Sequence, residues 1–173
     1  MLGASGRPVL EALVAELGES ANLAVLERDR VTYIEQVESH HTVRLFTEVG
    51  RRVYAHCTGV GKAVLSLLPD DQVRALVHRT GMPAQTPHSI TDPDELVLAL
   101  HGIRRDGFAV DDGEQEAGVR CVAVPVPAAD FRMAVSVSGP DARMTPELVV
   151  RAVPLLTQAS RDLALAMAGR APA

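Results

Sequence analysis

Apolar residues recur at two different spacings along the chain, and the spacing separates predicted helices from predicted strands. In residues 8–17 they recur every three or four positions, which predicts a first amphipathic helix. Residues 22–27, 31–38, 42–46 and 52–56 are short apolar and β-branched runs bounded by polar turns, as is typical of strands. Because these runs follow one another without long crossovers, we expect them to pair antiparallel.

The middle of the chain is predicted to be helical. A glycine-containing turn at residues 58–62 leads into a short helix, and residues 70–79 predict another one. Asp92 and Pro93 suit the cap and the first position of a third helix, and Gly107 suits its end.

Two further strands and a long helix complete the pattern. Residues 118–126 and 131–138 predict the strands, and Thr145 begins a helix that we expect to end near Gly169. Pro154 lies inside this helix and is expected to kink or split it. The order of elements predicts an α+β fold with one antiparallel sheet of about six strands and flanking helices.

The composition fits a single globular domain, or at most two small ones, and argues against nucleic-acid binding by this chain. The 173 residues are 47% hydrophobic, which is enough for one core. Aromatic residues make up only 3%, too few for a surface that stacks bases. The formal net charge is −5 and no cluster of Lys and Arg stands out, so we expect no tight binding to a phosphate backbone.

The sequence shows no pattern typical of export or of a membrane. Its start lacks a basic segment followed by an apolar run, and no segment approaches the roughly 18–20 apolar residues of a membrane span. Two cysteines in a chain of this length do not make a disulfide framework. We therefore expect a cytoplasmic protein with free thiols.

Residues 107–140 contain the most informative polar positions. Alternation puts Ser136 and Ser138 on one face of their strand, and Asp111 and Cys121 precede them in the same stretch. Polar side chains on the inner face of a sheet are destabilising unless they are satisfied, and a small polar ligand would satisfy them. A sheet face open to water would also account for the serines, and this stretch alone does not decide between the two.

The turn at residues 58–62 is a second candidate site. Gly59 and Gly61 expose backbone N–H groups at the start of a helix, where carboxylates and other anions bind. The turn is no phosphate-binding P-loop, since His56 and Ala63 stand where that motif needs Gly and Ser or Thr. A tight turn that needs glycine only for its backbone angles is the simpler interpretation of these residues alone.

A metal site and a catalytic centre are both weakly supported. The acidic run 111–116 is typical of a solvated loop, and the histidines and Cys57 lack the spacing of a ligand pair on a helix. Adjacent residues of a strand point to opposite faces, so His56 is not expected to activate Cys57. Cys121 stands in an apolar strand, which raises the pKa of a thiol. We expect no metal, no cofactor and no enzymatic activity.

Four short motifs in order carry a resemblance to a known family. They are H-x-T-G-x-G-K-A at residues 56–63, I-R-x-x-G-F-A-x-D at 103–111, G-V-x-C-V-A-x-P-V at 118–126 and S-V-S-G-P at 136–140. With them, nearly the whole chain resembles the effector-binding domain of the isocitrate lyase regulator (IclR) family of bacterial transcription factors.

The resemblance implies a GAF-like fold, with a curved antiparallel sheet and helices on both sides, and a pocket for a small organic acid or similar metabolite. Backbone amides at the glycine turn would meet the effector carboxylate. Cys57 and Val60 depart from the alanine that is usual at their positions, which bears on the size of the effector. The predicted effector-binding residues are Leu45, Val53, Gly59, Val60, Gly61, Asp111, Val119, Cys121, Ser136 and Ser138.

The resemblance also implies partners. The family carries a winged helix-turn-helix that reads DNA, and we expect residues 1–173 to form a single effector-binding domain, with DNA bound only through a helix-turn-helix outside this chain. Members usually self-associate as a homo-oligomer, and the apolar first and last helices are the candidate surfaces. We predict a ligand-sensing domain; the alternatives are a cysteine-dependent small-molecule enzyme on a GAF-like scaffold and a pure oligomerisation module.

Overall fold

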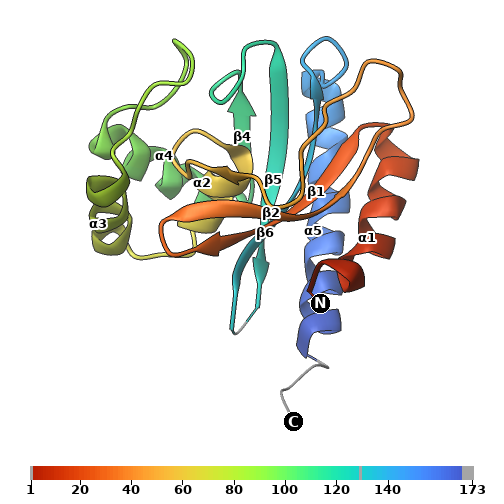
Figure 1. Ribbon diagram of the computed structural model, residues 1–173, viewed down its shortest axis with the longest axis horizontal. Coiled ribbons are helices and arrows are strands. Elements are labelled where there is room, and N and C mark those ends of the chain that lie inside the picture. The colour runs from red at the N-terminus through yellow and green to blue at the C-terminus, as the bar shows by residue number, and fades with distance from the viewer. Residues whose placement is uncertain (1, 129, 169–173) are drawn as a thin grey trace.

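The computed structural model describes residues 2–128 and 130–168, and one antiparallel sheet lies at its centre (Figure 1). The six strands lie in the order β3-β2-β1-β6-β5-β4. Each pair of neighbours is antiparallel, as short connections between adjacent runs predict. The strands are β1 (Ser20–Glu27), β2 (Arg30–Val37), β3 (Arg52–Val53), β4 (Ala109–Asp112), β5 (Val119–Pro127) and β6 (Arg132–Pro140).

Helices cover both faces of this sheet. Figure 1 shows the first and last helices side by side on one side of the sheet and the three middle helices grouped on the other. In the described residues no helix combines the length and the apolar character that a membrane crossing requires. The helices are α1 (Leu2–Leu17), α2 (Gly59–Leu65), α3 (Asp70–Thr80), α4 (Pro93–Asp106) and α5 (Pro146–Ala168).

The two faces of the sheet pack in two different cores. Large aliphatic side chains such as Leu23 and Leu156 fill the core between the sheet and α1 and α5. On the opposite face the sheet contributes small residues, including Ala24, Ala123 and Ala134, which α2 covers. Because small side chains let a helix come close to a sheet, this second face can hold a site between the strands and the start of α2.

Most of the predicted elements are confirmed, and the helix caps follow the expected chemistry. Asp92 Oδ1 accepts hydrogen bonds from the N–H groups of Asp94 and Glu95 at the start of α4. Gly107 ends that helix in the left-handed conformation, at φ 86°. The α+β fold with a six-stranded antiparallel sheet is therefore as predicted.

Two strand predictions are wrong: one predicted strand does not form, and one strand of the sheet was not predicted. Residues 42–46 form no strand, although their composition is strand-like, because they lie in the irregular segment between β2 and β3. Ala109–Asp112, which the sequence did not mark as a strand, pairs with β5 at the edge of the sheet. A four-residue edge strand carries too few alternating positions to be recognised before its partner is known.

Two helix predictions also need correction. α1 begins at Leu2 rather than at residue 8, so that Pro8 lies inside the helix. Pro154 does not split the last helix, which runs continuously from Pro146 to Ala168. Pro154 and Val150, whose carbonyl the proline leaves without its usual partner, are both exposed, so that water can take over the missing bond. The predicted end near Gly169 lies outside the described residues.

Candidate functional site

The polar residues that alternation put on one face form two adjacent rows across the sheet. Asp111 pairs with Cys121, which pairs with Ser138, and Ser138 pairs with Ser20 of β1. Residues directly opposite one another in antiparallel strands lie on the same face. In the next row Ala109, Ala123, Ser136, Asn22 and Gln36 are paired in the same way across five strands.

The two rows together form the floor of the candidate site. Helix α2 lies directly on this floor, and its glycines let the helix come this close. A Cβ atom added to Gly59 would lie 2.8 Å from Cys121 Sγ, and one added to Gly61 would collide with the backbone of Ala55. The N–H of Gly61 is taken up by the cap, since it donates to Thr58 Oγ1 at 3.1 Å. Gly59 and Val60 are the first residues of α2, and their N–H groups have no carbonyl partner inside the helix.

Buried amides, which the sequence did not single out, satisfy the two serines. Asn22 Nδ2 donates to Ser136 Oγ at 3.3 Å and to Ser138 Oγ at 2.9 Å. Gln36 Nε2 donates to Asn22 Oδ1 at 2.8 Å, and Gln36 Oε1 accepts from the N–H of Thr47 at 3.0 Å. Because each serine oxygen accepts from Asn22, its own O–H is left to donate to another group. The serines therefore need no ligand to be satisfied, and their hydroxyls can donate either to Cys121, which lies beside them, or to a ligand above them.

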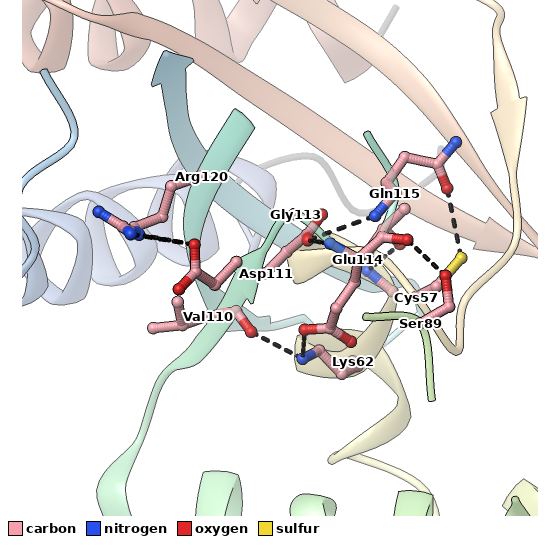
Figure 2. Close-up of polar contacts among 12 residues, drawn as sticks. Cys57, Lys62, Ser89, Val110, Asp111, Gly113, Glu114, Gln115 and Arg120 are labelled. Carbon is pink, nitrogen blue, oxygen red and sulfur yellow. Dashed lines mark hydrogen bonds and ion pairs between the residues drawn. The ribbon is translucent and has the colours of Figure 1, made fainter. Parts of the chain in front are cut away.

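Residues 111–119 form one wall of the site, the turn wall. A buried ion pair between Lys62 and Glu114 holds this wall in place (Figure 2). Lys62, the only lysine of the chain, reaches from α2 to Val110 O at 2.7 Å and to Glu114 Oε2 at 2.5 Å. Asp111 Oδ1 accepts the N–H of Glu114 at 2.7 Å. Ser89 Oγ donates to Glu114 O at 2.6 Å from the connection between α3 and α4. The acidic run is thus only partly solvated: Asp112 and Glu116 are exposed, as predicted from composition, whereas Asp111 and Glu114 are buried and Glu114 pairs with Lys62.

Asp111 and the two thiols are shifted by burial toward their neutral forms. Desolvation raises the pKa of Asp111 to about 6; two backbone N–H groups and Lys62 oppose the rise, and the Glu114 charge adds to it. Burial, reinforced by the Asp111 charge, raises the pKa of Cys57 and of Cys121 to about 12. At neutral pH both cysteines are thiols, and Cys57 Sγ donates to Gln115 Oε1 at 3.3 Å.

Residues 38–51 form the opposite wall, the loop wall, which has no regular secondary structure. Its contacts with the sheet are neutral: Ser20 Oγ donates to Leu45 O at 2.9 Å, and the Gln36 amide binds Thr47. Arg143, which is paired with buried Glu19, also donates to Val43 O at 2.6 Å.

A small cavity of about 40 Å³ lies between the two walls, above the floor. Seven of the ten predicted effector-binding residues line it: Leu45, Val53, Gly59, Asp111, Val119, Cys121 and Ser138. Three do not line it: Ser136 and Val60 are fully buried, and Gly61 is in the cap of α2. This space is small for an organic acid, so we expect one wall to move outward when an acid enters.

Six lining residues were missed by sequence reasoning: Tyr33, Thr47, Arg51, Thr58, Gln115 and Glu116. For two of them the signal was available, because Tyr33 and Arg51 stand two positions from Val31 and Val53, which pair with each other and are buried. Thr47 and Gln115 lie in irregular segments, whose direction no periodicity predicts.

The chemistry of the site favours binding over catalysis. Within the described part of the chain no group of three or more His, Cys, Asp and Glu side chains is arranged to hold a metal ion. His56 contacts Pro83 O at 3.0 Å through Nε2, and Cys57 contacts Gln115, so the two form no nucleophile and base pair.

Comparison with known proteins gives the family. Residues 2–165 match the family model described as Bacterial transcriptional regulator IclR C-terminal. The chain belongs to the IclR family and corresponds to its C-terminal effector-binding domain, as the four sequence motifs predict.

Its relatives are regulators. The HTH-type transcriptional regulator BhcR of Paracoccus denitrificans is 35% identical over 166 residues, which are 95% of this chain and 60% of that protein. The transcriptional repressor IclR of Escherichia coli is 34% identical over 94% of this chain and 61% of that protein. The chain therefore spans about 60% of the length of these relatives. The family they define is regulatory, not enzymatic.

Solved structures agree on the fold. The IclR protein of Thermotoga maritima superposes with a TM-score of 0.89 at 25% identity, covering 95% of this chain and 67% of that one. The C-terminal domain of the E. coli regulator KdgR gives a TM-score of 0.85 at 28% identity and covers 96% of this chain and 98% of that domain.

Proposed function

We propose that this chain is the ligand-sensing domain of a bacterial cytoplasmic transcription regulator, and that a small organic acid is its effector. The relatives named as regulators and repressors support the regulatory role. A winged helix-turn-helix outside this chain would bind the DNA, and the effector would act by favouring one arrangement of the domains over another.

The observation that carries the proposal is the floor itself. Asp111, Cys121 and Ser138 form one row on neighbouring strands, and Gly59 brings the unpaired N–H groups at the start of α2 directly above them. An effector carboxylate would accept from these N–H groups and from the Ser138 hydroxyl, which Asn22 leaves free to donate. Leu45, Val53 and Val119 would contact the apolar part of the acid.

Asp111 is suited to a second polar contact in the same place. Its pKa of about 6 lets it lose its charge, at little cost, beside a bound carboxylate, and in its charged form it accepts a hydrogen bond from an effector hydroxyl. A buried acid with a raised pKa that faces a cavity is typical of a functional site. Val60, Gly61 and Ser136 would act by shaping the floor and α2.

The test is a thermal-shift and calorimetric titration of the chain with a panel of small mono- and dicarboxylic acids. A bound acid at 100 to 1,000 times its Kd stabilises the fold by about 3–4 kcal/mol. Ser138→Ala should weaken binding about tenfold or more, because it removes a hydrogen bond to a charged group. The matched control is Ser160→Ala, a buried serine of α5 that donates to Pro125 O on the far side of the sheet. Equal loss in both variants, or no binding by the unaltered chain, contradicts the proposal.

Self-association is part of the same proposal. An apolar groove of about 370 Å³ runs between α1 and α5, with Val9, Leu13 and Leu155 among its lining residues. Two copies that bury this groove against each other would hold their effector domains in a fixed relative orientation. Sedimentation should then show a dimer or larger species that Leu155→Glu shifts toward monomer, and an unchanged distribution would exclude this surface.

A further inference from the structure

One positively charged side chain at the cavity, that of Arg51, is not paired with an acidic group in the described part of the chain. Arg51 lines the cavity from the loop wall at an exposed position, and its guanidinium makes no hydrogen bond or ion pair with any other described residue. It is the only positively charged side chain among the lining residues. An unpaired guanidinium beside a cavity has strong affinity for a carboxylate, which it can bind through two parallel N–H groups.

Backbone hydrogen bonds hold Arg51 in this orientation. The N–H of Gly50 donates to Tyr33 O at 2.7 Å, and the N–H of Tyr33 donates to Arg51 O at 3.0 Å, so that the two residues are neighbours across the β2–β3 edge. Gly50 adopts φ +93°, which closes the turn before Arg51. Arg51 stands two positions before Val53, which is buried and lines the same cavity, so both lie on one face.

Tyr33 adds a neutral donor beside this cation. Tyr33 lines the cavity, and burial, reinforced by the nearby Asp111 charge and Cys121 side chain, raises the pKa of the phenol, so the hydroxyl keeps its proton at neutral pH. Lys62, by contrast, is already paired with Glu114 and Val110 O and offers no free charge to a ligand.

An effector bound to α2 and Ser138 alone would therefore leave the exposed Arg51 guanidinium with water as its only partner. Covering Arg51 with an apolar group removes it from water without a partner, which is unfavourable. Glu116 also lines the cavity and, like Arg51, is exposed, and the structure shows no ion pair between the two side chains.

We propose that Arg51, assisted by the Tyr33 hydroxyl, is a specificity-determining residue that selects a dicarboxylic acid as the effector. This inference rests on the proposed function: the first carboxylate binds at the start of α2 and Ser138, and the second binds the Arg51 guanidinium. If the loop wall moves outward to admit an acid, it carries Arg51 with it, so the second carboxylate would also hold this wall in its new position.

The experiment compares acids of equal chain length, succinate with butyrate and glutarate with pentanoate, by calorimetry at constant ionic strength. The unaltered chain should bind the better dicarboxylate at least about tenfold more tightly than its monocarboxylate partner, the gain expected from one charge-assisted bidentate contact. Arg51→Gln should remove this preference while changing monocarboxylate affinity by less than about threefold. Tyr33→Phe should reduce the preference by a smaller factor.

Arg52→Gln is the matched control. It removes the same charge from the next residue, the first of β3, which alternation puts on the opposite face, and Arg52 does not line the cavity. Arg52→Gln should keep the preference for the dicarboxylate. A preference that survives Arg51→Gln, a stronger affinity for monocarboxylates, or an equal loss of both acids in Arg51→Gln overturns the inference and leaves the proposed acid site standing. If no acid of either kind binds the unaltered chain, the proposed function falls as well.

Discussion

The turn wall and the loop wall enclose one cavity but are held by different interactions. On the turn wall, Lys62 of α2 binds Val110 O and the buried Glu114 carboxylate, Ser89 binds Glu114 O from the connection before α4, and Asp111 accepts from the Glu114 N–H. On the loop wall, contacts through Ser20 and Gln36 hold a segment without secondary structure, and the exposed side chains of Val43 and Phe46 gain little from packing.

This difference indicates which wall an effector can displace. Breaking a buried ion pair leaves a charge in the interior, whereas the loop wall is joined to the sheet by neutral hydrogen bonds, whose groups water can solvate once the loop opens. We therefore expect the loop wall to move when an acid enters and the turn wall to stay in place. The Asn22 and Gln36 amides connect Ser138, on the floor, to Thr47, on the moving wall, so contact with the floor is linked to the loop's position.

The largest effect is expected from the buried charge of the turn wall. Lys62→Met leaves Glu114 without its partner and Val110 O without a donor, so the free energy of unfolding should fall by about 3–5 kcal/mol. Glu114→Gln in the same chain should restore part of the loss, because it removes the uncompensated carboxylate. Urea unfolding of both variants measures the difference; a loss below about 1 kcal/mol in Lys62→Met would show that the turn wall does not depend on this pair.

The next effect depends on pH and reports on Asp111. Its pKa is about 6 when folded against a usual 3.8, so over this interval the folded chain holds a proton that the unfolded chain has released. Stability therefore decreases as the pH rises from about 4 to 6.5, by up to about 3 kcal/mol at about 1.4 kcal/mol per pKa unit. Asp111→Asn, which keeps an acceptor for the Glu114 N–H, should flatten this dependence and be the more stable protein at pH 7. Parallel unfolding curves for the two chains across this range would contradict the prediction.

A smaller effect is expected where α2 touches the floor. Gly59→Ala places a methyl group 2.8 Å from Cys121 Sγ, and we expect it to destabilise the fold by about 2 kcal/mol. Cys121→Ala should relieve the collision, so the double variant should be more stable than the sum of the single changes predicts. A double-mutant cycle measured by thermal unfolding tests this, and additive losses would mean that α2 shifts away from the floor instead.

The smallest effect belongs to the loop wall. Gln36→Met keeps the volume but leaves Asn22 Oδ1 and the Thr47 N–H without partners, and we expect a loss of about 1–2 kcal/mol. Arg44→Gln, which breaks the exposed ion pair with Glu38, is the control and should change stability by less than about 0.5 kcal/mol. Hydrogen exchange of residues 38–51 should quicken in Gln36→Met and stay slow in the turn wall. A loss in Gln36→Met as large as that in Lys62→Met would remove the contrast between the walls.

The sequence by itself determined the helices, five of the six strands and the polar floor. Period-two alternation is local, so it shows that Ser136 and Ser138 share a face, and antiparallel pairing of neighbouring strands puts Cys121 beside Ser138. The four motifs added the family, and with it the glycine turn above that floor.

Only the tertiary structure decided what the floor residues contact and what closes the cavity. Asn22, Gln36 and Lys62 are polar residues in elements distant from the serines and the acidic run, and no local pattern pairs them with Ser138 or Glu114. The direction of an irregular segment depends on such long-range contacts rather than on its own composition. For this reason residues 42–46, which have the composition of a strand, form part of the loop wall instead. For the same reason the sequence did not indicate that Arg51, which follows a turn, lines the cavity.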